Sequence, residues 1–170
     1  YSVEIDTNID EIGVLWVGGS DVNFYSKNTS KNINPDFVFI EDIFDGIGEL
    51  HLSDITLNTS WISMGDFESP QDGGNSVLSL NRSSITTSRL MMSEGSTLQI
   101  NLDQLNQATP EAAIRVTNRA QLSGMLEIYS EDTDGNPSSI QIGDEFILIE
   151  AKYVGAPWDD EQYTTFDGIF

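Results

Sequence analysis

One run of side chains, DTDGN, has the ligand spacing of a calcium loop. Asp132, Asp134 and Asn136 place side-chain oxygens at alternate positions, and hard cations such as Ca²⁺ take oxygen ligands. The run is not an EF-hand, because Pro137 stands where that loop needs glycine and Gly143 stands where it needs a bidentate glutamate. Two interpretations stay open. One is a hairpin turn without metal, and the other is a calcium site, the only cofactor we expect.

Paired carboxylates are a second kind of reactive group. Asp159, Asp160 and Glu161 stand close to Asp167, and a glycosidase needs two carboxylates held across a sugar. Among 28 acidic residues, however, some such pair is inevitable. The chain has no Gly-x-Ser-x-Gly elbow, its single histidine is His51, and it lacks the His-Gly phrase used by polysaccharide-degrading β-helices. We therefore predict that the protein is not an enzyme.

Tryptophans offer a third possibility, because exposed aromatic rings can stack on sugars. We take Trp61 and Trp158 as the candidates, with a place in the core or in a cap as the alternative for each. Trp61 aligns with Arg89 in the repeat described next, which indicates an outward-facing position. This chemistry predicts an alternative function, a carbohydrate-binding module of a secreted protein with glycans as partners.

A tandem repeat must position these side chains. Residues 50–64 (LHLSDITLNTSWISM) match residues 78–92 (LSLNRSSITTSRLMM) without a gap, at an offset of 28 residues. Each copy holds two alternating strands joined by a short polar segment. A unit of this size cannot bury its own apolar face, so it must stack on its neighbours. Alternation also places His51, which lies between two leucines, on the opposite face toward solvent.

Short strands are predicted for the rest of the chain, in one all-β domain. We divide it into less regular N-terminal strands (1–49), repeat-like strands (50–152) and an aromatic, acidic tail (153–170) that caps one end of the stack. The polar residues 25–36 are predicted to form a surface loop. The predicted fold is a short β-solenoid with a C-terminal cap, and the alternative is a jelly-roll β-sandwich, which also has many short strands.

One stretch is apolar at four consecutive positions, Phe37, Val38, Phe39 and Ile40. Such a strand is buried on both faces or forms an edge that a partner covers. Together with the open ends of a strand stack, it is a candidate for pairing with another copy by strand addition. A head-to-tail contact that does not close produces a filament. Copies of the chain itself are therefore the expected partners.

From about residue 50 onward, the chain resembles the C-terminal part of bacterial extracellular β-solenoid proteins. These include autotransporter passenger domains and repeat proteins with PEP-CTERM or dockerin-like sorting tails. The resemblance is carried, in chain order, by WISMGD (61–66), GSTLQINL (95–102), IRVTNRAQLSGMLEI (114–128), GDEFILIEA (143–151) and FDGIF (166–170). The chain departs from the pattern by an insertion at 157–161, and it stops where such proteins usually continue. The resemblance implies a right-handed β-helix or related solenoid, secreted or surface-exposed, without catalytic residues.

The charge of the chain excludes several classes of partner. Only 7 basic residues accompany the acids, which gives a formal charge of −21 spread over the sequence. Nucleic acid binding needs Lys and Arg to neutralise phosphates, so we exclude it. Anionic membrane surfaces are disfavoured for the same reason, and no apolar run is long enough for membrane insertion.

Composition also favours a location outside the cell. The chain has no cysteine and begins at Tyr1, as a processed product does after removal of a leader. We predict a non-enzymatic extracellular or cell-surface structural protein, either a self-assembling filament or layer subunit or part of an adhesin. Salt or divalent cations would relieve the repulsion between its acidic copies.

Overall fold

The computed structural model describes residues 1–27, 29–41, 47–65, 75–102, 111–131, 140 and 144–155. The regular elements among them are strands: β1 (Ser2–Glu4), β2 (Ile9–Gly18), β3 (Asp21–Tyr25), β4 (Lys31–Glu41), β5 (Gly48–Ser53), β6 (Ile55–Met64), β7 (Ser76–Asn81), β8 (Ser84–Met92), β9 (Ser96–Asn101), β10 (Ile114–Gln121), β11 (Met125–Tyr129) and β12 (Ile149–Val154). The predicted all-β class is confirmed. Within these ranges, no helix is long and apolar enough to cross a membrane.

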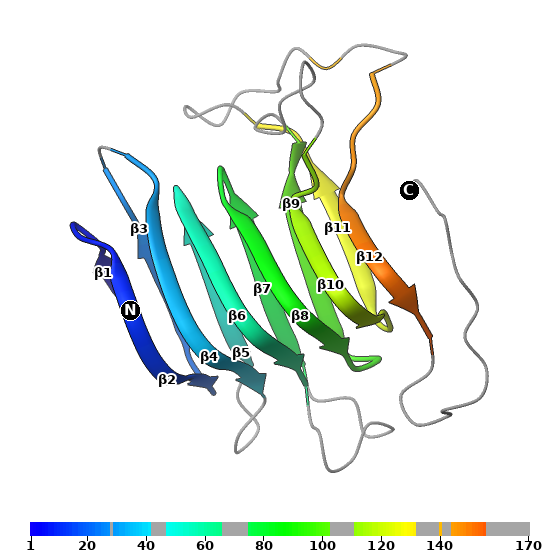
Figure 1. The fold of residues 1–170 in the computed structure, drawn as a ribbon, viewed down its shortest axis with the longest axis horizontal. Coiled ribbons are helices and arrows are strands. Elements are labelled where there is room, and N and C mark those ends of the chain that lie inside the picture. The colour runs from blue at the N-terminus through cyan, green and yellow to red at the C-terminus, as the bar shows by residue number, and fades with distance from the viewer. Residues whose placement is uncertain are drawn as a thin grey trace.

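Successive strands alternate between two facing sheets (Figure 1). Sheet A has the order β1-β3-β5-β7-β9-β11, and sheet B has the order β12-β10-β8-β6-β4-β2. Each strand pairs in parallel with the strand two places along the chain. The jelly-roll alternative is therefore wrong for the described strands, because it requires antiparallel neighbours. One odd-numbered strand and the even-numbered strand after it form a layer, and the N-terminal strands of residues 1–49 are layers of the same two sheets.

The tandem repeat reflects the pairing of the strands, because residues 28 positions apart lie opposite each other on neighbouring strands. Leu50 pairs with Leu78 in sheet A, and Ile62 pairs with Leu90 in sheet B. The polar segment within each copy is not a break between strands, because β6 and β8 run through it. The break lies one step earlier, at Asp54 and Arg82, which adopt φ values of 58° and 47°. The two side chains form a bidentate ion pair at 2.7 and 2.8 Å, and these hydrogen bonds raise the pKa of the Arg82 guanidinium.

The core consists of apolar columns, mostly aliphatic, that run through the layers between the two sheets. Strand alternation directs every second side chain inward, and parallel register stacks these side chains on one another. Sheet A contributes the columns Val22, Leu50, Leu78, Leu98, Leu126 and Phe24, Leu52, Leu80, Ile100, Ile128. Sheet B contributes Ile9, Ile33, Leu57, Ile85, Ile114, Ile149 and Leu15, Val38, Ile62, Leu90, Ala120, Val154.

Buried polar groups are paired at one corner of the stack. Ser96 donates its hydroxyl to the carbonyl of Met64 at 2.9 Å and lies 3.0 Å from the hydroxyls of Ser76 and Ser93. All three serines are buried, and a buried hydroxyl without a partner would cost stability. The cluster therefore joins three layers where the chain passes between the sheets.

Candidate functional site

The predicted calcium ligands Asp132, Asp134 and Asn136 lie outside the described residues, as does Trp158. The tail that was predicted to cap the stack lies outside them beyond Gly155. Those predictions remain predictions. The structure does place the other candidates, namely Trp61 and the stretch from Phe37 to Ile40.

The prediction that this apolar stretch is an edge for strand addition is wrong. β4 pairs with β2 on one side and with β6 on the other, so its backbone groups are already used. Val38 and Ile40 point inward and are buried in the core, whereas Phe37 and Phe39 point outward. Continuous apolar character here reflects one buried face and one aromatic outer face. The loop predicted for residues 25–36 is also too long, because β4 begins at Lys31.

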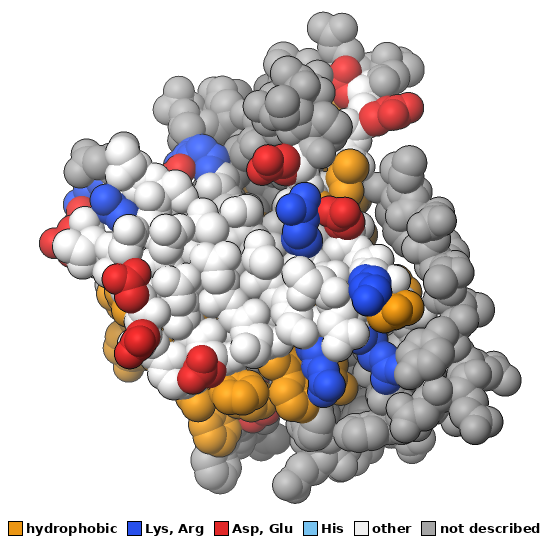
Figure 2. Space-filling view, in the orientation of Figure 1, with side chains coloured by type: hydrophobic (Ala, Val, Ile, Leu, Met, Phe, Trp, Pro, Cys, Tyr) orange, Lys and Arg blue, Asp and Glu red, His pale blue; other side chains and the backbone are white. Residues whose placement is uncertain are grey.

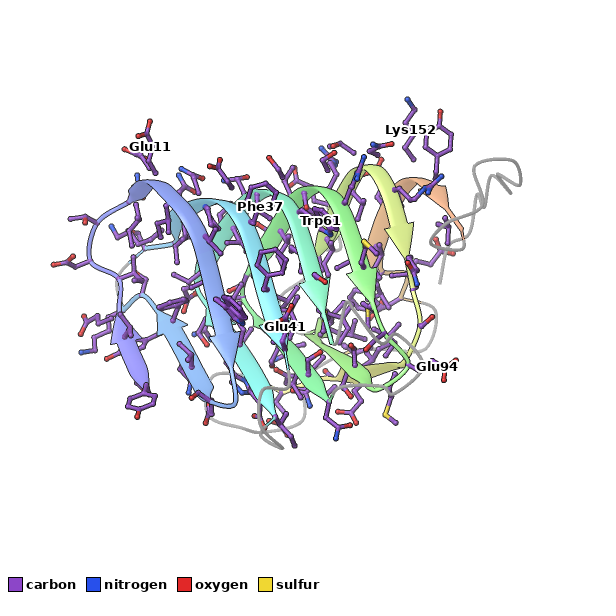
Figure 3. The ribbon with its side chains drawn as sticks, turned by 90° about the horizontal axis from the view of Figure 1, so that it is seen from below. Glu11, Phe37, Glu41, Trp61, Glu94 and Lys152 are labelled. Carbon is purple, nitrogen blue, oxygen red and sulfur yellow. The ribbon has the colours of Figure 1, made fainter. Side chains whose placement is uncertain are left out.

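The outward rings form an aromatic row across three strands of sheet B, made of Trp16, Phe37, Phe39 and Trp61. Ring centroids lie 6.3 Å apart for Trp16 and Phe39, 6.4 Å for Phe37 and Phe39, and 6.4 Å for Phe37 and Trp61. Phe37 and Trp61 project from neighbouring strands on the same side of the sheet (Figure 3). Exposure is highest at the end of the row, at 60% for Trp16, and it is 38% for Phe37.

A basic side chain, Arg89, lies at the other end of this row. The Arg89 guanidinium lies 5.8 Å from the centre of the Trp61 ring, a cation–π distance. This contact follows from the register, because Arg89 stands opposite Trp61 on the next strand. Trp61 was predicted to face outward in the same register as Arg89, and that is confirmed. Trp61 is half-buried, so Trp16 is the more accessible of these two tryptophans.

Beside the aromatic row, the outer face of sheet B is polar, with few charged side chains at its centre. Figure 2 shows uncharged side chains over most of this face, apolar ones along its lower border and basic ones toward the β10 and β12 end. The basic residues there are Arg115, Arg119 and Lys152, and Arg115 pairs with Glu150 of β12 at 2.9 Å. Asp10 and Glu11 lie on β2 at the opposite end. The side-chain N–H of Asn58 on β6 donates to the side-chain oxygen of Asn34 on β4 at 3.0 Å.

The sequence pattern missed the aromatic row as a unit because its strands do not follow the repeat offset. β4 and β6 are offset by 24 residues, as the Asn34 and Asn58 pair is, instead of 28. Phe37 and Trp61 therefore do not align in the tandem repeat. The available signal was the alternation of aromatic and aliphatic side chains from Phe37 to Ile40, which is a two-faced strand pattern.

The chemistry available to the aromatic row is stacking and apolar contact. Trp16 and Phe37 expose apolar surface, and a contiguous exposed apolar patch is typical of an interaction site. Searches against protein-family models, curated proteins and solved structures return no match to the chain.

Proposed function

We propose that the chain is a right-handed β-solenoid module of an extracellular structural or adhesive protein, and that its layers extend by stacking end to end with further copies. Parallel pairing in two sheets whose strands alternate along the chain supports a solenoid, and parallel crossovers are right-handed in almost all proteins. The module carries no chemistry of its own in this proposal. It supplies length and an outer surface.

The observation that carries the proposal is the exposure of the core columns at both ends. Leu50, Leu78 and Leu98 are at most 1% exposed, whereas Leu126 in the same column is 42% exposed. Ile128 is 49% exposed at the same end, and Val3, in line with Phe24, is 41% exposed at the other. Burial of apolar surface contributes roughly 25 cal/mol per Å². A further layer on either end would therefore be stabilised by both apolar contact and parallel strand pairing.

The charges of the outer face support a head-to-tail arrangement. Asp10 and Glu11 lie on the N-terminal edge strand of sheet B. The last two strands carry Arg115, Arg119 and Lys152 against one acid, Glu150, which pairs with Arg115 at 2.9 Å, so basic side chains are in excess at this end. Stacking in one direction brings opposite charges together at each junction. Stacking in opposite directions brings like charges together. Overall repulsion between copies of charge −21 opposes either contact at low salt.

Replacing Val3 with lysine is expected to abolish end-to-end assembly while leaving the fold intact. The side chain lies on the edge strand β1 and is exposed, and lysine on an edge strand blocks pairing with another chain. Sedimentation velocity and negative-stain electron microscopy in about 1 M NaCl, where screening is nearly complete, should show filaments for the wild type and monomers for V3K.

The matched control is Thr86→Lys, which changes the charge equally but lies on β8, within sheet B. T86K should assemble as the wild type does. A wild-type chain that stays monomeric at high protein and salt concentrations would refute the proposal, as would V3K filaments as abundant as those of the wild type.

The aromatic row supports a second candidate function, binding of a polysaccharide. Trp16 and Phe37 are exposed on a paired sheet, and rings held in place before binding lose little conformational entropy when they bind. The charge of −21 disfavours acidic polysaccharides, so a neutral or amine-bearing chain is the expected ligand.

Under this candidate function, Trp16→Ala should weaken retention on the preferred insoluble polysaccharide about tenfold, or about 1.4 kcal/mol. The control is Val14→Ala on the same strand and face, which removes an exposed apolar side chain without removing an aromatic ring. Depletion assays on neutral and amine-bearing polysaccharides measure the effect. An absence of wild-type binding to the whole panel, or an equal loss in V14A, would exclude sugar stacking here.

A further inference from the structure

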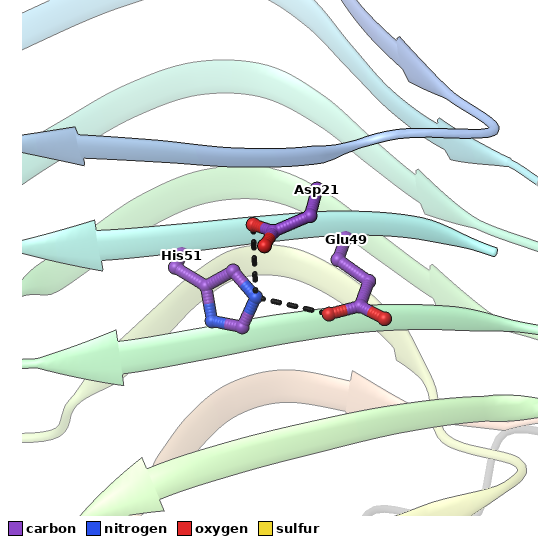
Figure 4. A group of neighbouring side chains, drawn as sticks. All are labelled: Asp21, Glu49 and His51. Carbon is purple, nitrogen blue, oxygen red and sulfur yellow. Dashed lines mark hydrogen bonds and ion pairs between the residues drawn. The ribbon is translucent and has the colours of Figure 1, made fainter. Parts of the chain in front are cut away.

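The single histidine of the chain lies between two carboxylates on the outer face of sheet A (Figure 4). His51 Nε2 is 3.2 Å from Glu49 Oε2 and 3.6 Å from Asp21 Oδ1. One donor atom from each of the three side chains lies within 4.8 Å of the other two. Alternation directs His51 outward, as predicted, and its side chain is 27% exposed beside the two acids.

The register of two neighbouring strands creates this arrangement. Asp21 on β3 stands directly opposite Glu49 on β5, and His51 follows two residues later on the same face. Like charges placed opposite each other on adjacent parallel strands repel. A cation held between the two carboxylates removes that repulsion, and the imidazole adds a nitrogen donor at the same point.

We propose that Asp21, Glu49 and His51 bind a divalent transition-metal ion of the Zn²⁺ class. One imidazole nitrogen and two carboxylate oxygens are a donor set that Zn²⁺ accepts at tetrahedral geometry. Ca²⁺ and Mg²⁺ favour oxygen ligands only, so the imidazole selects against them. Three protein donors leave a fourth position for water or an incoming ligand. This site is separate from the calcium loop predicted from sequence and does not depend on the proposed function.

A neighbouring amide orients one of the three donors. Asn23 donates its side-chain N–H to Asp21 Oδ1 at 3.0 Å, and it lies on β3 opposite His51. Partners of this kind hold a ligating carboxylate in place. The backbone of two paired strands fixes the spacing of all three donors, so little conformational entropy is lost on binding. The Asp21 side chain is 58% exposed, which leaves the site open to ions from solvent.

Titration with Zn²⁺ and Co²⁺ in neutral buffer tests the site. Calorimetry should show one strong site per chain, and the Co²⁺ form should have the visible absorption of low-symmetry coordination. Because His51 is the only histidine, its ring resonances in ¹⁵N NMR report directly on coordination through Nε2. Ca²⁺ at the same concentration should leave those resonances unchanged.

Two substitutions test the ligand set. His51→Ala and Glu49→Gln should each weaken Zn²⁺ binding at least tenfold, and circular dichroism verifies that each variant is folded. The matched control is Asp36→Asn, which removes an exposed carboxylate of sheet B and should leave binding unchanged. Zn²⁺ binding that survives H51A would show general carboxylate attraction and overturn the proposal. A wild-type chain without a strong Zn²⁺ site would also overturn it.

Discussion

Replacing Leu78 with alanine is expected to lower the free energy of unfolding by about 3 kcal/mol. Leu78 is fully buried at the middle of its column, between Leu50 and Leu98. Truncation removes apolar contacts to both neighbouring layers and leaves a cavity that the paired strands cannot close. Urea denaturation followed by circular dichroism measures the change.

The matched control is Leu126→Ala at the end of the same column. That side chain is 42% exposed, so the same truncation should cost about 1 kcal/mol or less. Equal losses for the two variants would mean that Leu126 is as well covered as Leu78. The proposal that further copies stack on an uncovered end of the core would then fail. The proposed Zn²⁺ site does not depend on this result.

Replacing Gly124 with alanine should be similarly damaging, with a loss of at least about 2 kcal/mol. Gly124 has a φ of 84°, a conformation that residues with a Cβ rarely adopt. An added methyl group would meet the backbone carbonyl oxygens of Ser96 and Ser93, the latter at 2.7 Å. Both serines belong to the buried hydroxyl cluster, so they cannot move aside without breaking the hydrogen bonds of that cluster.

Gly13→Ala is the appropriate comparison for this backbone effect. Gly13 lies within β2, and no atom lies within 4 Å of the position its Cβ would occupy. Alanine there should change the free energy of unfolding by no more than about 0.5–1 kcal/mol, in the stabilising direction. Thermal and urea unfolding of the two variants should differ clearly. A Gly124→Ala protein as stable as the wild type would contradict the geometry of the turn.

The repeat can be recognised in the sequence only where paired strands keep the same offset. The tandem repeat predicted the pairing of Leu50 with Leu78 because parallel register stacks identical positions on one another. The same 28-residue offset separates Val22 from Leu50, but β2 and β4 pair at a different offset, 23 residues between Val14 and Phe37. Offsets elsewhere vary from 20 residues between Ser76 and Ser96 to 35 between Arg115 and Glu150, which hides the repeat.

Strand ends were predicted less well than strand interiors. The continuous apolar run of residues 146–149 is typical of a strand, yet β12 begins only at Ile149. Local apolar character shows that a segment is buried, but hydrogen bonding to a neighbour decides whether it is a strand. Lys31 shows the reverse case, because it joins β4 in polar sequence by pairing with Ile55.

The sequence by itself determined that the chain is all-β, that its central layers stack with Leu50 on Leu78, and that Trp61 and His51 face outward. These properties depend on alternation and spacing along the chain, which are local. Only the tertiary structure decided that Phe37 and Phe39 join Trp16 and Trp61 in one row, and that Asp21 lies beside His51. The physical reason is that neighbours in a parallel sheet come from different layers, and the length of each connecting segment sets which residues meet.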